Sequence, residues 1–169
     1  MRVLKSVALM AAIAVLGCGG GDDDDNGNPT GPPTGGAANG TMTAQIGGAS
    51  WRSIGAINVS RQPQQNTIAF AGSGSAGSTT YAVSISIANA TGTGTHNLNV
   101  LAGGDGSTLI IGNSAALGWA SAGQGASGTL TITSLTTNRI VGTFSGTLSP
   151  AGHSAGNLVV TSGTFDVTF

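Results

Sequence analysis

Apolar and polar residues alternate with a period of two over several stretches of the chain after Thr41. The alternation is clearest at 81–88, 129–133, 140–148 and 164–169. This pattern is typical of β-strands that bury one face and expose the other. No helix of ten residues is expected after Thr41, because glycine or β-branched residues at a spacing of two interrupt every candidate segment.

Further strands are expected between these segments, bounded by turns rich in Gly, Asn, Ser and Pro: 42–46, 54–60, 67–71, 96–101, 107–112 and 115–121. About nine or ten short strands predict an all-β domain over residues 41–169, folded as an antiparallel β-sandwich or barrel. Glycines inside the strands are expected to mark bulges or close approaches of neighbouring strands. All seven aromatic residues lie in this domain, and their default role is to fill its core: Trp51, Phe70, Tyr81, Trp119, Phe144, Phe165 and Phe169.

The N-terminal 17 residues follow a different pattern, that of a secretory signal peptide. Arg2 and Lys5 form a basic start, and residues 7–16 (VALMAAIAVL) form an apolar run of ten. A transmembrane helix needs about 20 apolar residues, so this run is too short to span a bilayer. We therefore expect residues 1–17 to be a signal peptide that is cleaved.

The chain's single cysteine, Cys18, directly follows this segment. Val15-Leu16-Gly17-Cys18 resembles the bacterial lipobox, in which an aliphatic and a small residue precede an invariant cysteine. The resemblance implies that diacylglycerol is attached to the Cys18 sulfur, that the chain is cut before Cys18, and that the new N-terminus is acylated. Two or three acyl chains give stable membrane anchoring. The alternative is an ordinary signal peptide with a chance cysteine; one cysteine allows no disulfide within the chain.

Residues 18–40 connect this cysteine to the β-domain and are rich in Gly, Asp and Pro. Such a stretch is expected to form a disordered, flexible linker. The aspartates at 22–25 are adjacent and lack the alternating spacing of a calcium-binding loop. An acidic run at this place resembles the surface-export signal of some bacterial lipoproteins, and Gly19 differs from the aspartate that retains others at the inner membrane. Both features predict a location at the outer membrane or cell surface.

Five segments of the domain carry a resemblance to a known family: 42–51 (MTAQIGGASW), 94–98 (GTHNL), 127–133 (SGTLTIT), 142–148 (GTFSGTL) and 162–169 (SGTFDVTF). They are similar to a family of small β-rich bacterial lipoprotein domains of unknown function. His96 stands where that family has an aromatic residue. The resemblance implies a β-fold and a lipid anchor, and it brings no catalytic residues.

Charged residues are scarce, at 7% of the chain. From Thr41 onward the net charge is +1 and comes from three arginines and two aspartates, with no glutamate. Nucleic-acid binding needs several clustered cations, so nucleic acid is excluded as a partner. The two aspartates are isolated in the sequence, and no carboxylate pair suited to acid–base catalysis is present. The charged residues of the domain are Arg52, Arg61, Arg139, Asp105 and Asp166.

Three glycine-rich motifs resemble functional signatures without their context. Residues 152–156 (GHSAG) fit the G-x-S-x-G nucleophile elbow around Ser154, but they lie between two expected strands, and no histidine follows Ser154 to complete a triad. Residues 72–77 and 123–128 match G-x-G-x-x-G, but no helix follows either one to bind a pyrophosphate. All three are expected to be loops.

Metal binding is not expected either. His96 and His153 are the only histidines and lie in different segments. A zinc site would need a third ligand, and Cys18 is assigned to lipid. The sequence therefore predicts no metal and no other cofactor.

The sequence thus predicts a lipid-anchored, non-catalytic cell-envelope lipoprotein, acting as a structural or interaction module. Its expected partners are the membrane, through the anchor, and a glycan or envelope protein. Three alternatives stay open: a carbohydrate- or small-ligand-binding module, a ligand-holding barrel similar to lipocalin-type carriers, and, with least support, a serine hydrolase at Ser154. In a binding module the exposed aromatic platform would be Trp119, whereas Trp51 is expected in the core.

Overall fold

The computed structural model describes residues 36–99 and 103–169 of the chain. The described residues all belong to one unit of the chain, Gly31–Phe169. The expected signal peptide, the expected lipidation site Cys18 and the greater part of the expected linker lie outside the described residues.

Eleven strands and one short 3-10 helix are the regular elements of the described residues, which confirms the predicted all-β class. No helix in this part of the chain has the length and hydrophobicity to cross a membrane. In chain order the elements are β1 (Gly36–Ile46), β2 (Ala49–Arg52), β3 (Ile57–Gln62), η1 (Pro63–Gln65), β4 (Thr67–Ala76), β5 (Thr79–Ile87), β6 (Gly94–Asn97), β7 (Thr108–Asn113), β8 (Gly118–Ala120), β9 (Ser127–Leu135), β10 (Arg139–Ala151) and β11 (Leu158–Thr168).

The first strand begins earlier than the sequence pattern indicates. Residues up to 40 are assigned to the linker by composition, and for 36–40 this assignment is wrong. Residues 36–38 pair with β3, and residues 39–40 pair with β11. The segment GAANG has no apolar alternation, so backbone pairing alone defines it as a strand.

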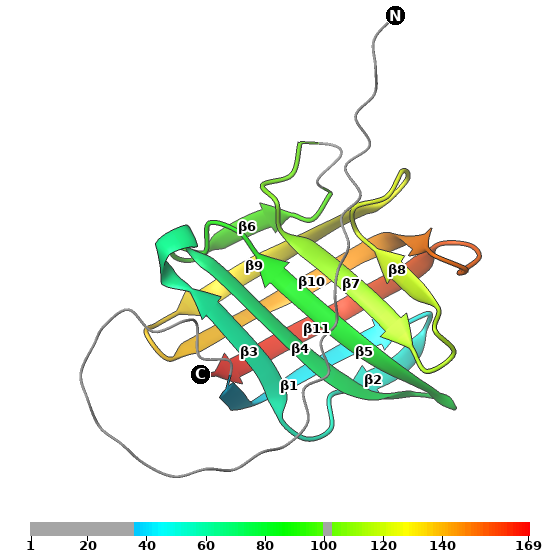
Figure 1. Cartoon of the computed structure of the whole chain (residues 1–169), viewed down its shortest axis with the longest axis horizontal. Coiled ribbons are helices and arrows are strands. Elements are labelled where there is room, and N and C mark those ends of the chain that lie inside the picture. The colour runs from blue at the N-terminus through cyan, green and yellow to red at the C-terminus, as the bar shows by residue number, and fades with distance from the viewer. Residues whose placement is uncertain (1–35, 100–102) are drawn as a thin grey trace, which may run out of the picture. The chain divides into compact units, whose positions relative to one another are not determined.

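Eight antiparallel strands form a closed barrel in the order β11–β1–β2–β4–β5–β7–β8–β10, and β10 pairs with β11 to close the ring. The other three strands lie outside this ring. β3 pairs with β1 and β4 beside the short β2, β9 pairs with β10, and β6 pairs with β9. Figure 1 shows two layers, in which β3, β4, β5 and β7 cross in front of β1, β11, β10 and β9.

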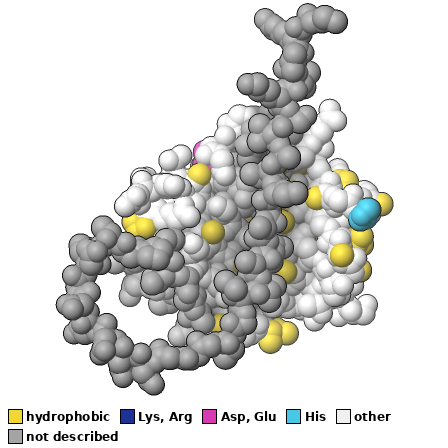
Figure 2. Space-filling view, viewed as in Figure 1, with side chains coloured by type: hydrophobic (Ala, Val, Ile, Leu, Met, Phe, Trp, Pro, Cys, Tyr) yellow, Lys and Arg dark blue, Asp and Glu magenta, His cyan; other side chains and the backbone are white. Residues whose placement is uncertain are grey.

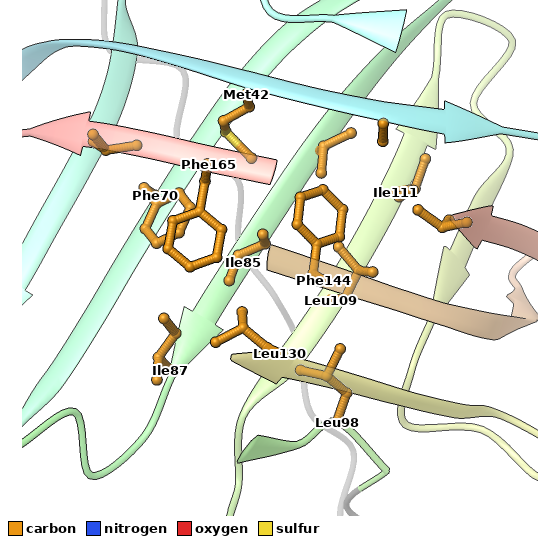
Figure 3. Packing of buried hydrophobic residues seen from close by; sticks show 14 of the residues in the cluster. Met42, Phe70, Ile85, Ile87, Leu98, Leu109, Ile111, Leu130, Phe144 and Phe165 are labelled. Atoms are coloured by element: carbon orange, nitrogen blue, oxygen red, sulfur yellow. The ribbon is translucent and has the colours of Figure 1, made fainter. Parts of the chain in front are cut away.

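Apolar side chains fill the space between the two layers. The ring of Phe165 on β11 lies 5.1 Å, between centroids, from Phe70 on β4 and 6.4 Å from Phe144 on β10. Figure 3 shows these rings at the centre of the core, with Met42 and Ile85 beside them. The interior of the barrel is therefore a packed core. Other fully buried side chains are Ile46, Trp51, Ile57, Ile68, Ile87, Leu98, Leu109 and Ile111.

Two glycines of the C-terminal hairpin make room for these rings. Gly142 on β10 lies opposite Phe165, and Gly163 on β11 lies opposite Phe144. A Cβ at Gly142 would overlap the carbonyl oxygen of Thr131 and the Phe165 ring, and a Cβ at Gly163 would lie 2.7 Å from the Phe144 ring. Each ring thus covers a glycine of the opposite strand. This confirms the prediction that strand glycines mark close approaches.

Candidate functional site

Three hollows open on one outer face of the barrel, and residues of β1, β2, β9, β10 and β11 supply most of their lining. Their volumes are about 530, 430 and 300 Å³. Thr43 and Arg52 line the first and second hollows, Thr143 and Thr164 line the second and third, and Ser162 lines the first and third. The hollows therefore form one continuous surface. We call it the threonine face and define it by these five shared residues.

A row of five threonines, which ends at Arg52, crosses this face perpendicular to the strands. Its members lie in register on six neighbouring strands, so each is the direct cross-strand partner of the next. Their side chains point outward because successive residues of a strand face opposite sides, and the flanking positions, such as Met42 and Ala44 beside Thr43, are buried. The row runs Thr95 (β6), Thr131 (β9), Thr143 (β10), Thr164 (β11), Thr43 (β1) and Arg52 (β2).

The hydroxyl groups of the row are partly paired. The Oγ1 atoms of Thr43 and Thr164 lie 2.7 Å apart, and those of Thr95 and Thr131 lie 3.1 Å apart. In both pairs either oxygen can donate the hydrogen. The hydroxyl of Thr143, between the two pairs, has no hydrogen-bond partner among the described residues. The row therefore presents both donors and acceptors to solvent.

A bulge in β11 lies at the centre of the threonine face. Thr43 pairs with Thr164, but two positions along β1 the partner of Gln45 is Thr161, so β11 carries an extra residue there. Ser162 in the bulge has a φ of +51°, a left-handed conformation that is uncommon for a residue other than glycine. Bulges bend a strand and redirect its side chains. The bend places Ser162 in the lining of two of the three hollows.

Three charged groups lie on or beside this face, and two of them neutralise each other. Arg139 donates two hydrogen bonds to Asp166, from Nε to Oδ1 at 2.8 Å and from Nη2 to Oδ2 at 2.6 Å. These hydrogen bonds hold the pKa of Asp166 below its ordinary value. Arg52 is exposed and has neither a hydrogen bond nor an ion pair from its side chain within the described part of the chain. The face therefore carries one uncompensated positive charge.

The expected aromatic platform is not on the surface. The exposure predicted for Trp119 is wrong, since only 8% of this residue is exposed and its Nε1 donates to the carbonyl oxygen of Gly156 at 3.1 Å. The reason is topological: β8 closes the barrel between β7 and β10, so this position faces the core. Trp51 is buried as predicted, and its Nε1 donates to the carbonyl oxygen of Tyr81 at 3.3 Å.

The glycine-rich motifs take ordinary structural roles. Ser154 lies in the loop between β10 and β11, where its Oγ accepts a hydrogen bond from the backbone N–H of Gly118 at 2.6 Å. This strand-to-strand loop is not the strand-to-helix turn of a nucleophile elbow. Of the motif at 72–77, all but Gly77 belongs to strand β4, so the expectation of a loop is wrong there. Gly74 passes so close to the carbonyl oxygen of Arg52 that no Cβ fits.

One polar cluster lies away from the threonine face and was not foreseen from the sequence. Asp105, expected to be isolated, lies with Oδ2 2.5 Å from Nδ1 of the buried His96. The backbone N–H of Ser107 donates to Asp105 Oδ1 at 2.9 Å. Burial by itself raises the pKa of Asp105, but hydrogen bonds from Ser107 and His96 outweigh it and hold this pKa below its ordinary value.

This cluster does not have the geometry of a catalytic triad. The Ser107 hydroxyl and the Asp105 carboxylate both approach the same ring nitrogen, Nδ1 of His96, at 3.4 and 2.5 Å. In a triad the carboxylate orients one nitrogen while the other accepts the serine proton. Ser107 is also fully buried, and its Oγ accepts a hydrogen bond from the backbone N–H of Ala88. The cluster links the end of β5 to β6 and to the start of β7.

The described residues contain no group of three or more His, Cys, Asp or Glu that could hold a metal ion. The chain matches no family model, and neither a curated protein nor a solved structure is significantly similar to it. The lipobox and the resemblance to lipoprotein domains stay predictions. The threonine face, with its hydroxyl groups and the unpaired Arg52, is the candidate ligand-binding surface of the described domain.

Proposed function

We propose that this chain is a lipid-anchored, non-catalytic binding module of the bacterial cell envelope, and that the threonine face is its contact surface. The lipobox Val15–Cys18 supports the anchor, with diacylglycerol on the Cys18 sulfur and an acyl group on its nitrogen. The packed core of the described barrel favours a surface site over an internal one, because the interior is filled by rings such as Phe70, Phe144 and Phe165. This weighs against the lipocalin-like alternative.

The observation that carries the proposal is a difference between the two outer faces of the barrel. Across the centre of the opposite face, Ala71, Ser84 and Ile110 are cross-strand partners, and Ser73, Ala82 and Gly112 form the neighbouring row. In Figure 2, which views this side, the visible surface is mostly uncharged, with small scattered apolar patches. Threonine favours strands in general, so propensity alone would place it on both faces. Threonine is more frequent on the hollowed face, where five threonines lie in one row, and this supports a role of that face in contact.

The anchor is tested by acyl labelling of cells that express the full chain. We expect wild-type protein to take up labelled palmitate and to sediment with membranes. Cys18→Ala should lose the label and leave the membrane fraction. Unchanged membrane partitioning of this variant would contradict the anchor.

The contact surface is tested by photocrosslinking in intact cells. A photoreactive amino acid placed at Thr143 reports on the threonine face, and one placed at Ala82 reports on the opposite face; both residues are exposed. We expect crosslinked products from position 143 and few from position 82. Equal crosslinking from both positions, or none from position 143, would contradict the assignment of the contact surface.

A further inference from the structure

We infer that the threonine face binds an acidic polysaccharide, with Arg52 pairing with a carboxylate of the chain and the threonine row binding its hydroxyl groups. This inference rests on the proposed function, because it names the ligand class of the same surface.

Arg52 supplies the first step, the recognition of negative charge. It ends the threonine row and lines both the first and the second hollow. The other two arginines of the domain already have interaction partners. Arg139 is bound to Asp166, and Arg61 donates to the carbonyl oxygen of Thr137 at 2.5 Å and lies over the Phe169 ring. A free guanidinium pairs well with a planar carboxylate through two parallel hydrogen bonds.

The hydroxyl groups supply the second step, the recognition of an uncharged polar chain. Threonine and serine hydroxyls donate and accept, as sugar hydroxyls do. The first hollow adds the Gln45 side chain, whose Nε2 donates to Ser50 Oγ at 2.8 Å. With neighbouring strands about 4.8 Å apart, the row from Thr95 to Arg52 spans roughly 24 Å, long enough for several sugar units of an extended chain.

The low charge of this face favours an acidic polysaccharide over other polyanions as the ligand. One uncompensated guanidinium suits a polymer whose charge is carried by sparse carboxylates. Nucleic acids and polyphosphates require several clustered cations. Protein interfaces in turn have an apolar core, whereas Ile54 is the only one of the domain's exposed large hydrophobic residues, among those described, that lines a hollow. An acidic glycan fits this combination better than either.

The test is a titration of the full-length protein in detergent with partly methyl-esterified oligogalacturonate, whose carboxylates are sparse, and with its full methyl ester, which has the same sugars but no charge. Affinity is measured by calorimetry, and contacts by amide chemical shifts. We expect the acid to bind about tenfold more tightly than the ester, because one charge-assisted pair is added. Shifts should concentrate at Thr43, Arg52 and Thr164 and spare Ala82. Added salt should weaken binding of the acid alone.

Arg52→Gln removes the charge from an exposed side chain, so the fold should be retained. We expect this variant to bind the acid about tenfold more weakly and to lose the preference for the acid over the ester. Arg61→Gln, which removes the same charge from an arginine that already has partners, is the control and should leave both affinities unchanged. A parallel titration with glycan fragments of the cell's own wall shows whether the acidic chain belongs to the envelope or to an external polysaccharide; binding of either supports the inference.

Two outcomes would overturn the inference and separate it from the proposed function. Equal affinity for acid and ester, with no effect of Arg52→Gln, would show that the ligand is not acidic. If chemical shifts on the threonine face still changed, the proposed binding function would stand. If neither oligomer binds and position 143 gives crosslinks to a protein, the partner of the threonine face is a protein and not a glycan. If position 143 gives no crosslinks either, the proposed function fails as well.

Discussion

The Oγ1 atoms of Thr43 and Thr164 lie 2.7 Å apart although the two residues are 121 positions apart in the chain. The contact joins β1 to β11 at the point where the N-terminal and C-terminal strands of the domain meet. It also sits beside the bulge at Ser162, within the lining of the hollows. The centre of the threonine face is therefore built only when the barrel has closed.

Replacing both threonines of this pair should weaken glycan binding and reduce the stability of the domain only slightly. Thr43→Val with Thr164→Val keeps side-chain shape and strand propensity but removes the two hydroxyls. Because Thr164 is exposed and Thr43 only half-buried, we expect a loss of about 1 kcal/mol or less in the free energy of unfolding, measured in urea. Glycan affinity should fall several-fold in the same variant. Unchanged affinity would contradict a role for these hydroxyls.

Gly142→Ala should destabilise the barrel strongly. The added methyl group would overlap the Thr131 carbonyl oxygen and the Phe165 ring, neither of which can move without disturbing the hairpin or the core. We expect a loss of about 3 kcal/mol or more in the free energy of unfolding. Gly94→Ala on β6 is the matched control, because no atom lies within 4 Å of its added Cβ. Similar losses in the two variants would refute this account of the glycine.

Asp105 should make the domain sensitive to acid. Its pKa in the folded state lies below the ordinary value of 3.8, so the charged carboxylate stabilises the fold at any pH above that value. This stabilisation is lost as the pH falls through the folded-state pKa. We expect wild-type protein to be more stable than Asp105→Asn at pH 6, and the two melting temperatures to converge as the pH is lowered well below 3.8. A gap that stays constant over this range would show that charge is not the cause.

The two tryptophans should report a buried environment. Trp51 and Trp119 are 2% and 8% exposed, and each ring nitrogen is hydrogen-bonded to a backbone carbonyl. We expect blue-shifted fluorescence and weak quenching by acrylamide. Strong quenching of Trp51→Phe, in which only Trp119 remains, would restore Trp119 as a candidate surface platform.

The strands that bury alternate residues could be predicted from the sequence, because burial of one face leaves apolar and polar residues alternating along the chain. The segments 81–88 and 140–148 correspond closely to β5 and to much of β10. The same rule fails for residues 36–40, which pair through the backbone without apolar alternation. It also fails for Gly72 and Gly74, which look like loop residues but allow β4 to pass close to the segment at Arg52 and Ser53.

The site was less accessible to sequence reasoning than the fold. The repeated G-T-F at 142–144 and 163–165 could have indicated two threonines side by side on paired strands. Bringing Thr43 into the same row depends on the register of β1 against β11, which the bulge at Ser162 shifts and alternation does not reveal. Asp105 and His96 meet through loop geometry that has no sequence signature. The prediction that Trp119 is exposed was wrong because β8 closes the barrel between β7 and β10, and its ring faces the core.

Thiol accessibility in intact cells shows whether a partner in the envelope covers the threonine face. The chain has one cysteine, which the proposed lipid modification blocks, so Thr143→Cys and Ala82→Cys each introduce a single reactive thiol on opposite faces. In the purified protein a small maleimide should label both at similar rates. In cells we expect slow labelling at position 143 and unchanged labelling at position 82. Equal rates at the two positions would show that no partner covers the threonine face.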